Sequence, residues 1–399
     1  MVKARIERIA SFSRVQDGLN SFHARKNEII DWIIAVQQIP APTFHEVQRA
    51  KYIESQFVRL GLKDVWRDNV NNVYGRFPGS NPSANKPVII SAHSDTVFPP
   101  DTNLQVDRRN NMIYGPGIGD NSTGVGGLFA IADTLRSFDL QPRADLWFVS
   151  NVCEEGLGDL RGMRAVVDHF GRQATYIVVE GGLFGQIAHE AVGVRRFRID
   201  VETPGGHSWG SFGTASAIHE ISHLIAAIAR LNVPEKPKTT YNVGVIEGGT
   251  SINTIASSAA MLLDLRSENA AELERLVNLV SDIVLRTQKR AARRKNGVIF
   301  SIEPVGSRPA GRIPRNTPIV RWAEEALRFS GSRSVIYVAG STDANIPLSL
   351  GIPSVCIGLT ESANSHRLDE NIDPERLPCG LKQLLLLTLA AGNFHNLTG

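Results

Sequence analysis

The sequence predicts an α/β protein in which helices flank a mixed, mostly parallel sheet, with a second domain of α+β type inserted into it. Four continuous apolar runs each end in a polar cluster: "KPVIISAHSDT", "ADLWFVSNVCEE", "ATYIVVEGG" and "GIPSVCIGLTESANSH". Such runs indicate strands that are covered on both faces. Helical patterns such as "TGVGGLFAIADTLRSF" and "LRGMRAVVDHF" lie between them. This alternation of strand and helix is typical of the α/β class.

From about Val194 the pattern changes to strand, helix, two strands, helix and strand. The six segments are "VRRFRIDVET", "ASAIHEISHLIAAIARL", "TYNVGVIEGG", "SSAAMLLDLRS", "AAELERLVNLVSDIVLRTQKR" and "GVIFSIEPV". This order predicts a ferredoxin-like layer, an antiparallel sheet with two helices on one face. After Arg308 the α/β pattern returns with the helix "NTPIVRWAEEALRFSG". We therefore expect a first domain made of residues 1–192 and 307–399, interrupted by an inserted domain at 193–306.

Composition sets the broad class of the protein. The 399 residues are 42% hydrophobic and 21% charged, which is ordinary for a globular chain with two cores. The net charge of +3 is spread evenly, so we expect neither a nucleic acid nor a membrane surface as partner. Three irregularly spaced cysteines favour a reducing compartment, and no signal peptide or membrane-spanning stretch is recognisable. A cytoplasmic location is the expectation.

Chemically active side chains gather where the predicted strands end, which is where open α/β sheets bind ligands. They are His93, Asp95, Glu154, Glu155, Glu180 and His366, joined by Asp120 in the glycine-rich "GPGIGDNSTGVGG". Carboxylates at this density repel one another unless divalent cations bind them. Imidazole and carboxylate ligands without thiolate favour zinc, with cobalt or manganese as substitutes. More ligands are present than one open zinc site needs, so we expect two ions.

Each of these residues also has a purely structural interpretation. A histidine at a strand end is often a hydrogen-bonding group, and Asp120 alone reads as the N-cap of the following helix. Glu154 and Glu155 alone fit a solvated turn as well as a site. If the strand continues through them, they point to opposite faces and can serve two different purposes. Their coincidence at successive strand ends favours a site.

The motifs resemble those of the co-catalytic di-zinc peptidases and deacylases. This family includes peptidase T, glutamate carboxypeptidase, aminoacylase, acetylornithine deacetylase and succinyl-diaminopimelate desuccinylase. The resemblance rests on "VIISAHSDTV", "GPGIGDNSTGVGG", "CEEGLGDLRG", "VVEGG", "TPGGHSWG", "STDANIPLSLGIPSV" and "SHRLDE", in this order from about Ile39 to the C-terminus. Within the family, these motifs are most similar to those of the peptidase T-like and glutamate carboxypeptidase-like branch. A zinc exopeptidase-like fold with an inserted lid and dimerisation domain is implied.

The resemblance also implies a role for each site residue. One zinc would be held by His93, Asp120 and Glu180, and the other by Asp120, Glu155 and His366. Asp95 would orient His93, and Glu154 would be the general base that activates water. His207 would stabilise the oxyanion in the active site of the partner subunit, which implies a homodimer joined through the inserted domains. Substrate contacts are implied for Asn253, Arg266, Arg308, Ser341 and Thr342.

The expected activity is hydrolysis of an amide bond in a di- or tripeptide by a metallo-exopeptidase. Deacylation of an N-acyl amino acid would use the same residues, so aminopeptidase, carboxypeptidase and deacylase stay open. The two arginines favour a substrate carboxylate, which a guanidinium can grip with two hydrogen bonds. A zinc-binding scaffold without catalysis is a further alternative, although Glu154 and the ligands are all present. A serine hydrolase is disfavoured because the sequence has no G-x-S-x-G elbow.

Overall fold

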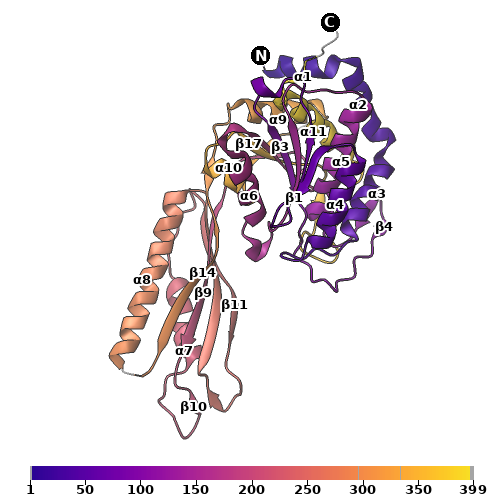
Figure 1. The fold of residues 1–399 in the computed structure, drawn as a ribbon. Helices are drawn as coiled ribbons and strands as arrows, with labels where there is room; N and C mark the ends of the chain where they lie inside the picture. The colour runs from indigo at the N-terminus through magenta and orange to yellow at the C-terminus, as the bar shows by residue number, and fades with distance from the viewer. Residues whose placement is uncertain (1, 295, 333, 396–399) are drawn as a thin grey trace. The chain divides into compact units, whose positions relative to one another are not determined.

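The computed structural model describes residues 2–294, 296–332 and 334–395. The chain forms two compact units (Figure 1). The first unit comprises the chain up to Ala191 together with the chain from Arg312 onward, and the second unit is Val192–Gly311.

The first unit is built on a mixed sheet with the strand order β1-β2-β6-β3-β7-β17-β8, and β16 also pairs with β8. The strands are β1 (Lys63–Arg67), β2 (Val73–Phe77), β3 (Val88–His93), β6 (Leu146–Asn151), β7 (Thr175–Glu180), β8 (Gln186–Ala191), β16 (Ile336–Gly340) and β17 (Ser354–Gly358). The four central strands β6, β3, β7 and β17 run parallel. They are the four apolar runs of the sequence, and they are almost wholly buried.

Helices cover both faces of this sheet. They are α1 (Val2–Ser11), α2 (Ser13–Ala24), α3 (Lys26–Gln37), α4 (Val47–Arg59), α5 (Gly124–Ser137), α6 (Arg161–Phe170), α9 (Pro318–Phe329), α10 (Asn345–Ser349) and α11 (Leu377–Ala391). In Figure 1, α4 and α5 lie on one side of the sheet and α6 and α10 on the other. Because α2, α3 and α11 also pack against α5, this helix is buried from Gly124 to Leu135, which agrees with the apolar character of most of this stretch.

A small second sheet in the first unit joins two distant parts of the chain. Its order is β18-β19-β5-β4, with β4 (Asp107–Arg109), β5 (Met112–Tyr114), β18 (Ser362–Ala363) and β19 (Asn371–Ile372). The antiparallel pairing of β19 with β5 places the segment that contains His366 beside the segment that leads to Asp120.

The second unit has the predicted ferredoxin-like order. Its elements are β9 (Gly193–Glu202), α7 (Ala217–Ile228), β11 (Thr239–Gly248), β13 (Ser258–Ser267), α8 (Ala270–Arg294) and β14 (Ile299–Arg308). The antiparallel sheet has the order β11-β13-β9-β14, and α7 and α8 pack on it around their own apolar core. A two-stranded sheet of β10 (Gly206–His207) and β12 (Thr254–Ile255) belongs to the same unit, and β15 (Gly311–Arg312) lies at the boundary. The predicted fold class, with its inserted α+β layer, is confirmed.

Within the described part of the chain, no helix combines the length and apolar character that crossing a bilayer requires.

Candidate metal centre

The site lies at the carboxyl edge of the parallel strands in the first unit. His93 is the last residue of β3 and Glu180 is the last residue of β7, and these strands are parallel neighbours. Parallel strands bring their carboxyl ends to one edge, so two residues far apart in sequence meet there. Both side chains are buried.

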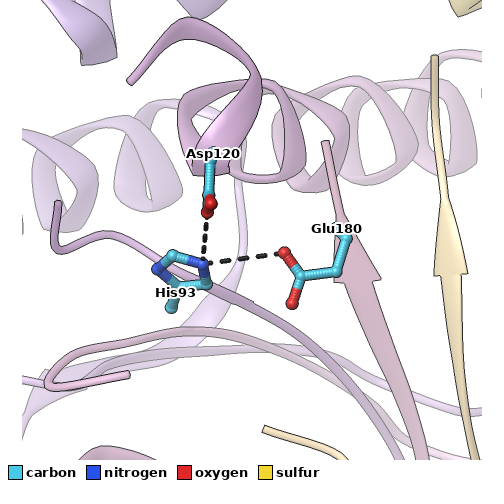
Figure 2. A group of neighbouring side chains, drawn as sticks. All are labelled: His93, Asp120 and Glu180. Atoms are coloured by element: carbon cyan, nitrogen blue, oxygen red, sulfur yellow. Dashed lines mark ion pairs between the residues drawn. The ribbon is translucent and has the colours of Figure 1, made fainter. Parts of the chain in front are cut away.

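One group of potential ligands is centred on Nε2 of His93. This atom lies 3.1 Å from Oδ1 of Asp120 and 3.6 Å from Oε2 of Glu180. Figure 2 shows the imidazole between the two carboxylates, which come from different elements. Their ligand atoms lie within 4.8 Å of one another and could hold a metal ion.

A second group of potential ligands shares Asp120 with the first. Nε2 of His366 lies 3.0 Å from Oε1 of Glu155 and 3.2 Å from Oδ2 of Asp120. Asp120 therefore turns one carboxylate oxygen toward His93 and the other toward His366. A third overlapping group consists of His93, Glu154 and Glu155, so Glu154 lies next to residues of both other groups.

The spacing and chemistry of these atoms fit metal ligation. Two ligand atoms that are each about 2.1 Å from a tetrahedral zinc ion are about 3.4 Å apart. The four nitrogen–oxygen distances around His93 and His366 run from 3.0 to 3.6 Å. Imidazole and carboxylate donors suit zinc and also cobalt or manganese.

The neighbouring carboxylates raise the pKa of both histidines. Burial alone lowers the pKa of His93, but its hydrogen bonds with Asp120, Asp95 and Glu180 leave that pKa well above its ordinary value. Hydrogen bonds with Asp120 and Glu155 raise the pKa of His366 to about 10. Burial opposes ionisation of Asp120, yet its two histidine partners hold its pKa below the usual range. A divalent ion would replace these protons.

The adjacent acids Glu154 and Glu155 are not on a strand, so the expectation that strand alternation separates them is wrong. β6 ends at Asn151, and Cys153 turns the chain with a φ of 57°. The backbone N–H groups of Glu154 and Glu155 donate to Oδ1 and Oδ2 of Asp95, each at 2.9 Å. One buried carboxylate thus fixes the peptide units of both acids, and the turn directs their side chains.

Asp95 also lies beside His93. Nδ1 of the imidazole is 3.2 Å from the backbone carbonyl oxygen of Asp95 and 3.5 Å from its Oδ1. The hydroxyl of Thr43 donates to the other carboxylate oxygen at 2.9 Å. Both the carbonyl and the carboxylate of Asp95 therefore lie near Nδ1 of His93, and its orienting role stays a prediction.

The loop that carries Asp120 is held from two directions. Gly117 has a φ of +71°, a conformation that favours glycine, and opens the turn Ile118–Thr123. Nδ2 of Asn121 donates to the carbonyl of Val179, next to Glu180, at 2.9 Å. The residue that precedes α5 as its N-cap is Thr123. The N-cap interpretation of Asp120 is therefore wrong, because this side chain lies before the helix and faces two histidines.

Glu370 is a buried residue of this region that sequence reasoning missed. Its carboxylate accepts backbone N–H groups of Gly117, Gly119 and Asp120 at 3.0, 2.8 and 2.7 Å. Burial raises the pKa of Glu370 to about 7, although the three N–H groups favour the ionised form. The only sequence signal is its place in "SHRLDE", four residues after His366.

Further buried polar residues behind the site also went unpredicted. Glu46 accepts the N–H of Cys153 at 3.2 Å, and Arg49 donates to the carbonyl of Ser94 at 2.8 Å. Nδ2 of Asn151, at the end of β6, donates to Oδ2 of Asp343 at 2.6 Å. Such acids, amides and guanidinium groups look in the sequence like ordinary surface residues.

Two of the remaining predicted residues meet in the second unit. β10 pairs with β12, so that His207 lies opposite Thr254, and the N–H of Ser208 donates to the carbonyl of Asn253 at 3.0 Å. The exposed ring of His207 accepts the N–H groups of Trp209 and Gly210 through Nδ1, both at 3.3 Å.

The two arginines lie in the second unit, on the strands that flank β9. Arg266 on β13 and Arg308 on β14 both pair with Val194 of β9, one on each side. Arg266 forms an ion pair with Asp264 at 2.7 Å, and the side chain of Arg308 is buried.

Ser341 and Thr342 lie in the first unit, directly after β16. The hydroxyl of Thr342 accepts the N–H of Ala344 at 3.2 Å.

The first unit thus combines an α/β sheet with two histidines and several carboxylates at one edge, a donor set that suits a metal-dependent hydrolase. Residues 89–390 match the sequence profile of Peptidase family M20/M25/M40. The chain belongs to this family, whose members hydrolyse amide bonds.

Known proteins are similar to this chain in sequence and in fold. A probable carboxypeptidase of Aspergillus niger is 29% identical over 213 residues, and the alignment covers 48% of this chain and 50% of the relative. The chain thus spans about half the length of that relative. A Staphylococcus aureus tripeptidase superposes with a TM-score of 0.76 and 21% identity, over 92% of this chain and 98% of the tripeptidase. The di-peptidase Dug1p of Saccharomyces cerevisiae superposes with a TM-score of 0.77 and 14% identity, over 96% of this chain and 99% of Dug1p. These superpositions show that the fold is shared.

Proposed function

We propose that the protein is a di-zinc exopeptidase that cleaves one amide bond of a di- or tripeptide. The observation that carries this proposal is the position of Asp120, whose two carboxylate oxygens face two different histidines at 3.1 and 3.2 Å. One carboxylate shared in this way is suited to bridge two ions at the short separation that hydrolytic two-metal sites use.

The proposed ligands leave one acid of the cluster for proton transfer. His93, Asp120 and Glu180 would hold one zinc ion, and Asp120, Glu155 and His366 the other. The two ions would supply Lewis acidity toward the substrate carbonyl and lower the pKa of water. Glu154, which lies beside His93 and Glu155, takes the proton from the attacking water and gives it to the leaving amine.

A small peptide is supported as substrate by the names of the similar proteins, which are a tripeptidase, a di-peptidase and a probable carboxypeptidase. Arg266 and Arg308 flank Val194 and would bind a substrate carboxylate, with Asn253, Ser341 and Thr342 as further contacts. The presence of two arginines beside the same residue of β9 favours a substrate with a free carboxylate.

The second unit would also form a homodimer and supply His207 as the oxyanion donor. Large apolar side chains near His207 support an interface there, because Trp209, Phe212 and Ile252 are almost fully exposed. Interfaces are enriched in aromatic residues.

The test combines metal analysis with a substrate panel of di- and tripeptides and matched N-acyl amino acids. We expect zinc bound at two ions per chain, cleavage of the peptides, loss of activity on chelation and recovery when zinc is returned. Preference for the N-acyl amino acids would replace the peptidase assignment with a deacylase. Two bound ions without cleavage of any panel member would contradict catalysis and support a scaffold. Chelator-resistant activity would contradict the metal mechanism.

A further inference from the structure

The buried carboxylate of Glu370 lies against the backbone of the loop that carries Asp120. Oε1 accepts the N–H groups of Gly119 and Asp120 at 2.8 and 2.7 Å, and Oε2 accepts the N–H of Gly117 at 3.0 Å. The side chain has no exposed surface. Three hydrogen bonds from the N–H groups of one loop to a single side chain fix the direction of the loop's peptide units.

Pairing in the small sheet brings Glu370 to this position. β19 starts directly after Glu370 and pairs with β5, which ends directly before the loop. The N–H of Gly115 also donates to the backbone carbonyl of Glu370 at 2.9 Å. At Gly119 a Cβ atom would lie 3.0 Å from Oε1 of Glu370, so the glycine permits the close approach of loop and carboxylate.

The contacts of Glu370 connect the chain segments of two proposed metal ligands, Asp120 and His366. Asp120 is itself one of the three residues whose N–H groups bind Glu370, and His366 lies four positions before Glu370 in the chain. The side chain of Asp120 can face two histidines with separate oxygens only if its backbone is held between them. Glu370 is the residue that ties the Asp120 backbone to the His366 segment.

We propose that Glu370 is a positioning residue of the metal centre, which sets the backbone of Asp120 so that one carboxylate serves both ions. The proposal rests on the metal centre of the proposed function but not on the identity of the substrate. Groups that orient metal ligands typically change metal affinity by about 10–100-fold when they are mutated.

The informative substitution is Glu370→Gln, which keeps the size of the side chain. A glutamine retains one oxygen for Gly119 and Asp120, but its NH₂ group faces the N–H of Gly117, and two donors cannot bond to each other. The loop then shifts at Gly117 while the surrounding core keeps its packing.

Glu324→Gln is the matched control. Glu324 is also a buried glutamate of the first unit, and it accepts hydrogen bonds from Tyr337 at 2.7 Å and Arg328 at 3.1 Å. These partners lie outside the three potential ligand groups. Glu324→Gln therefore reports the general cost of removing a buried negative charge.

The experiment measures zinc affinity of the full-length protein by competition with a chromophoric chelator, alongside the melting temperature of the metal-free form. We expect Glu370→Gln to bind zinc about 10–100-fold more weakly than wild type, and Glu324→Gln to bind it like wild type even if its melting temperature falls. Gly119→Ala, whose Cβ would lie 3.0 Å from Oε1 of Glu370, 3.1 Å from Cβ of Ser362 and 3.2 Å from Cγ2 of Ile372, should weaken zinc binding in the same direction.

Wild-type zinc affinity in Glu370→Gln would overturn the proposal, and so would an equal loss in Glu324→Gln. If Glu370→Gln does not fold, Gly119→Ala decides, and wild-type affinity in that variant overturns the proposal. Failure of the proposed function is a different result, because it would appear as a wild-type protein that binds zinc but cleaves no member of the substrate panel. A wild-type protein that takes up no zinc would overturn both.

Discussion

Two buried carboxylates hold the backbone at Glu154, Glu155 and Asp120 in the candidate metal centre. Asp95 fixes the peptide units of Glu154 and Glu155, while Glu370 fixes that of Asp120. A buried carboxylate that accepts backbone N–H groups is well satisfied and rigid. These residues therefore prepare the ligand geometry before an ion arrives.

Glu154→Gln should separate metal binding from catalysis. Glutamine keeps the shape of the side chain but cannot take up a proton, and general acid–base catalysis contributes about 10²–10⁴-fold to rate. We expect turnover to fall by that factor while zinc content is unchanged, as measured by steady-state kinetics and metal analysis of the same preparation. Activity close to wild type would show that another group is the base.

Zinc uptake should release protons from both histidines. The pKa of His366 is raised to about 10 by Asp120 and Glu155, which favours a protonated ring at neutral pH without metal, and the carboxylates near His93 shift its pKa in the same direction. Zinc must displace these protons, and its apparent affinity should therefore rise with pH until the pKa of His366 is passed. Titration calorimetry at pH 7 in two buffers of different ionisation enthalpy measures the release. Equal heats in both buffers would contradict the assignment.

The site residues that the sequence predicts have local signals in the chain. The residues that it does not predict act through contacts with distant segments. His93 and Glu180 end buried strands, Asp120 lies in a glycine-rich turn, and Glu155 and His366 stand in short motifs, so their signals are local in the sequence. Glu370 acts through the main chain of a loop some 250 positions away, and nothing in its neighbours reveals that contact. Pairing between distant strands creates such residues, so only the structure identifies them.

At the scale of elements, β7 and the turn Ile118–Thr123 approach so closely that only glycine fits between them. A Cβ atom on Gly181, directly after Glu180, would lie 1.9 Å from the carbonyl oxygen of Gly119. The sequence displays this requirement as the "VVEGG" motif. The motif was visible before the structure, but its cause was not.

Gly181→Ala should push this turn away from the end of β7. Overpacking of this kind typically costs about 1–3 kcal/mol, and here it would also move Asp120 relative to Glu180. We expect a lower melting temperature of the metal-free protein and weaker zinc binding. Gly340→Ala is the control, since its Cβ would meet nothing closer than Cγ2 of Thr342 at 3.7 Å. If Gly181→Ala and Gly340→Ala bind zinc equally well, the close approach does not matter for the site.

The elements of both units were largely predictable because their hydrophobic periods are strong. The four buried strands of the first unit and the six elements of the second appear in the structure in the predicted order. The small sheet formed by β4, β5, β18 and β19 was not predicted, because its strands have only two or three residues. Strands this short leave no periodic signal and depend on pairing with a distant partner.

At the scale of the whole molecule, the two units have separate apolar cores. Among the described residues, the three groups that could hold a metal ion lie in the first unit. A ligand that binds only the folded state stabilises it by about 2.7 kcal/mol when its concentration is 100 times its dissociation constant. Metal should therefore act on the stability of one unit and not of the other.

Differential scanning calorimetry should show two unfolding transitions, of which only one moves to higher temperature with zinc. The segment 192–311, expressed alone, should fold and reproduce the transition that zinc leaves unchanged, since it contains its own core. A single transition, or a zinc-dependent shift of the isolated segment, would contradict the independence of the two cores.

The position of the second unit in the chain also determines the order in which the proposed ligands leave the ribosome. His93, Asp120, Glu155 and Glu180 all leave the ribosome before the second unit does, and His366 leaves after it. A nascent chain therefore carries one complete set of proposed ligands and two of the three members of the other set while the second unit folds. Glu370 emerges four residues after His366, so the last ligand and the residue that aligns Asp120 reach the folding protein together.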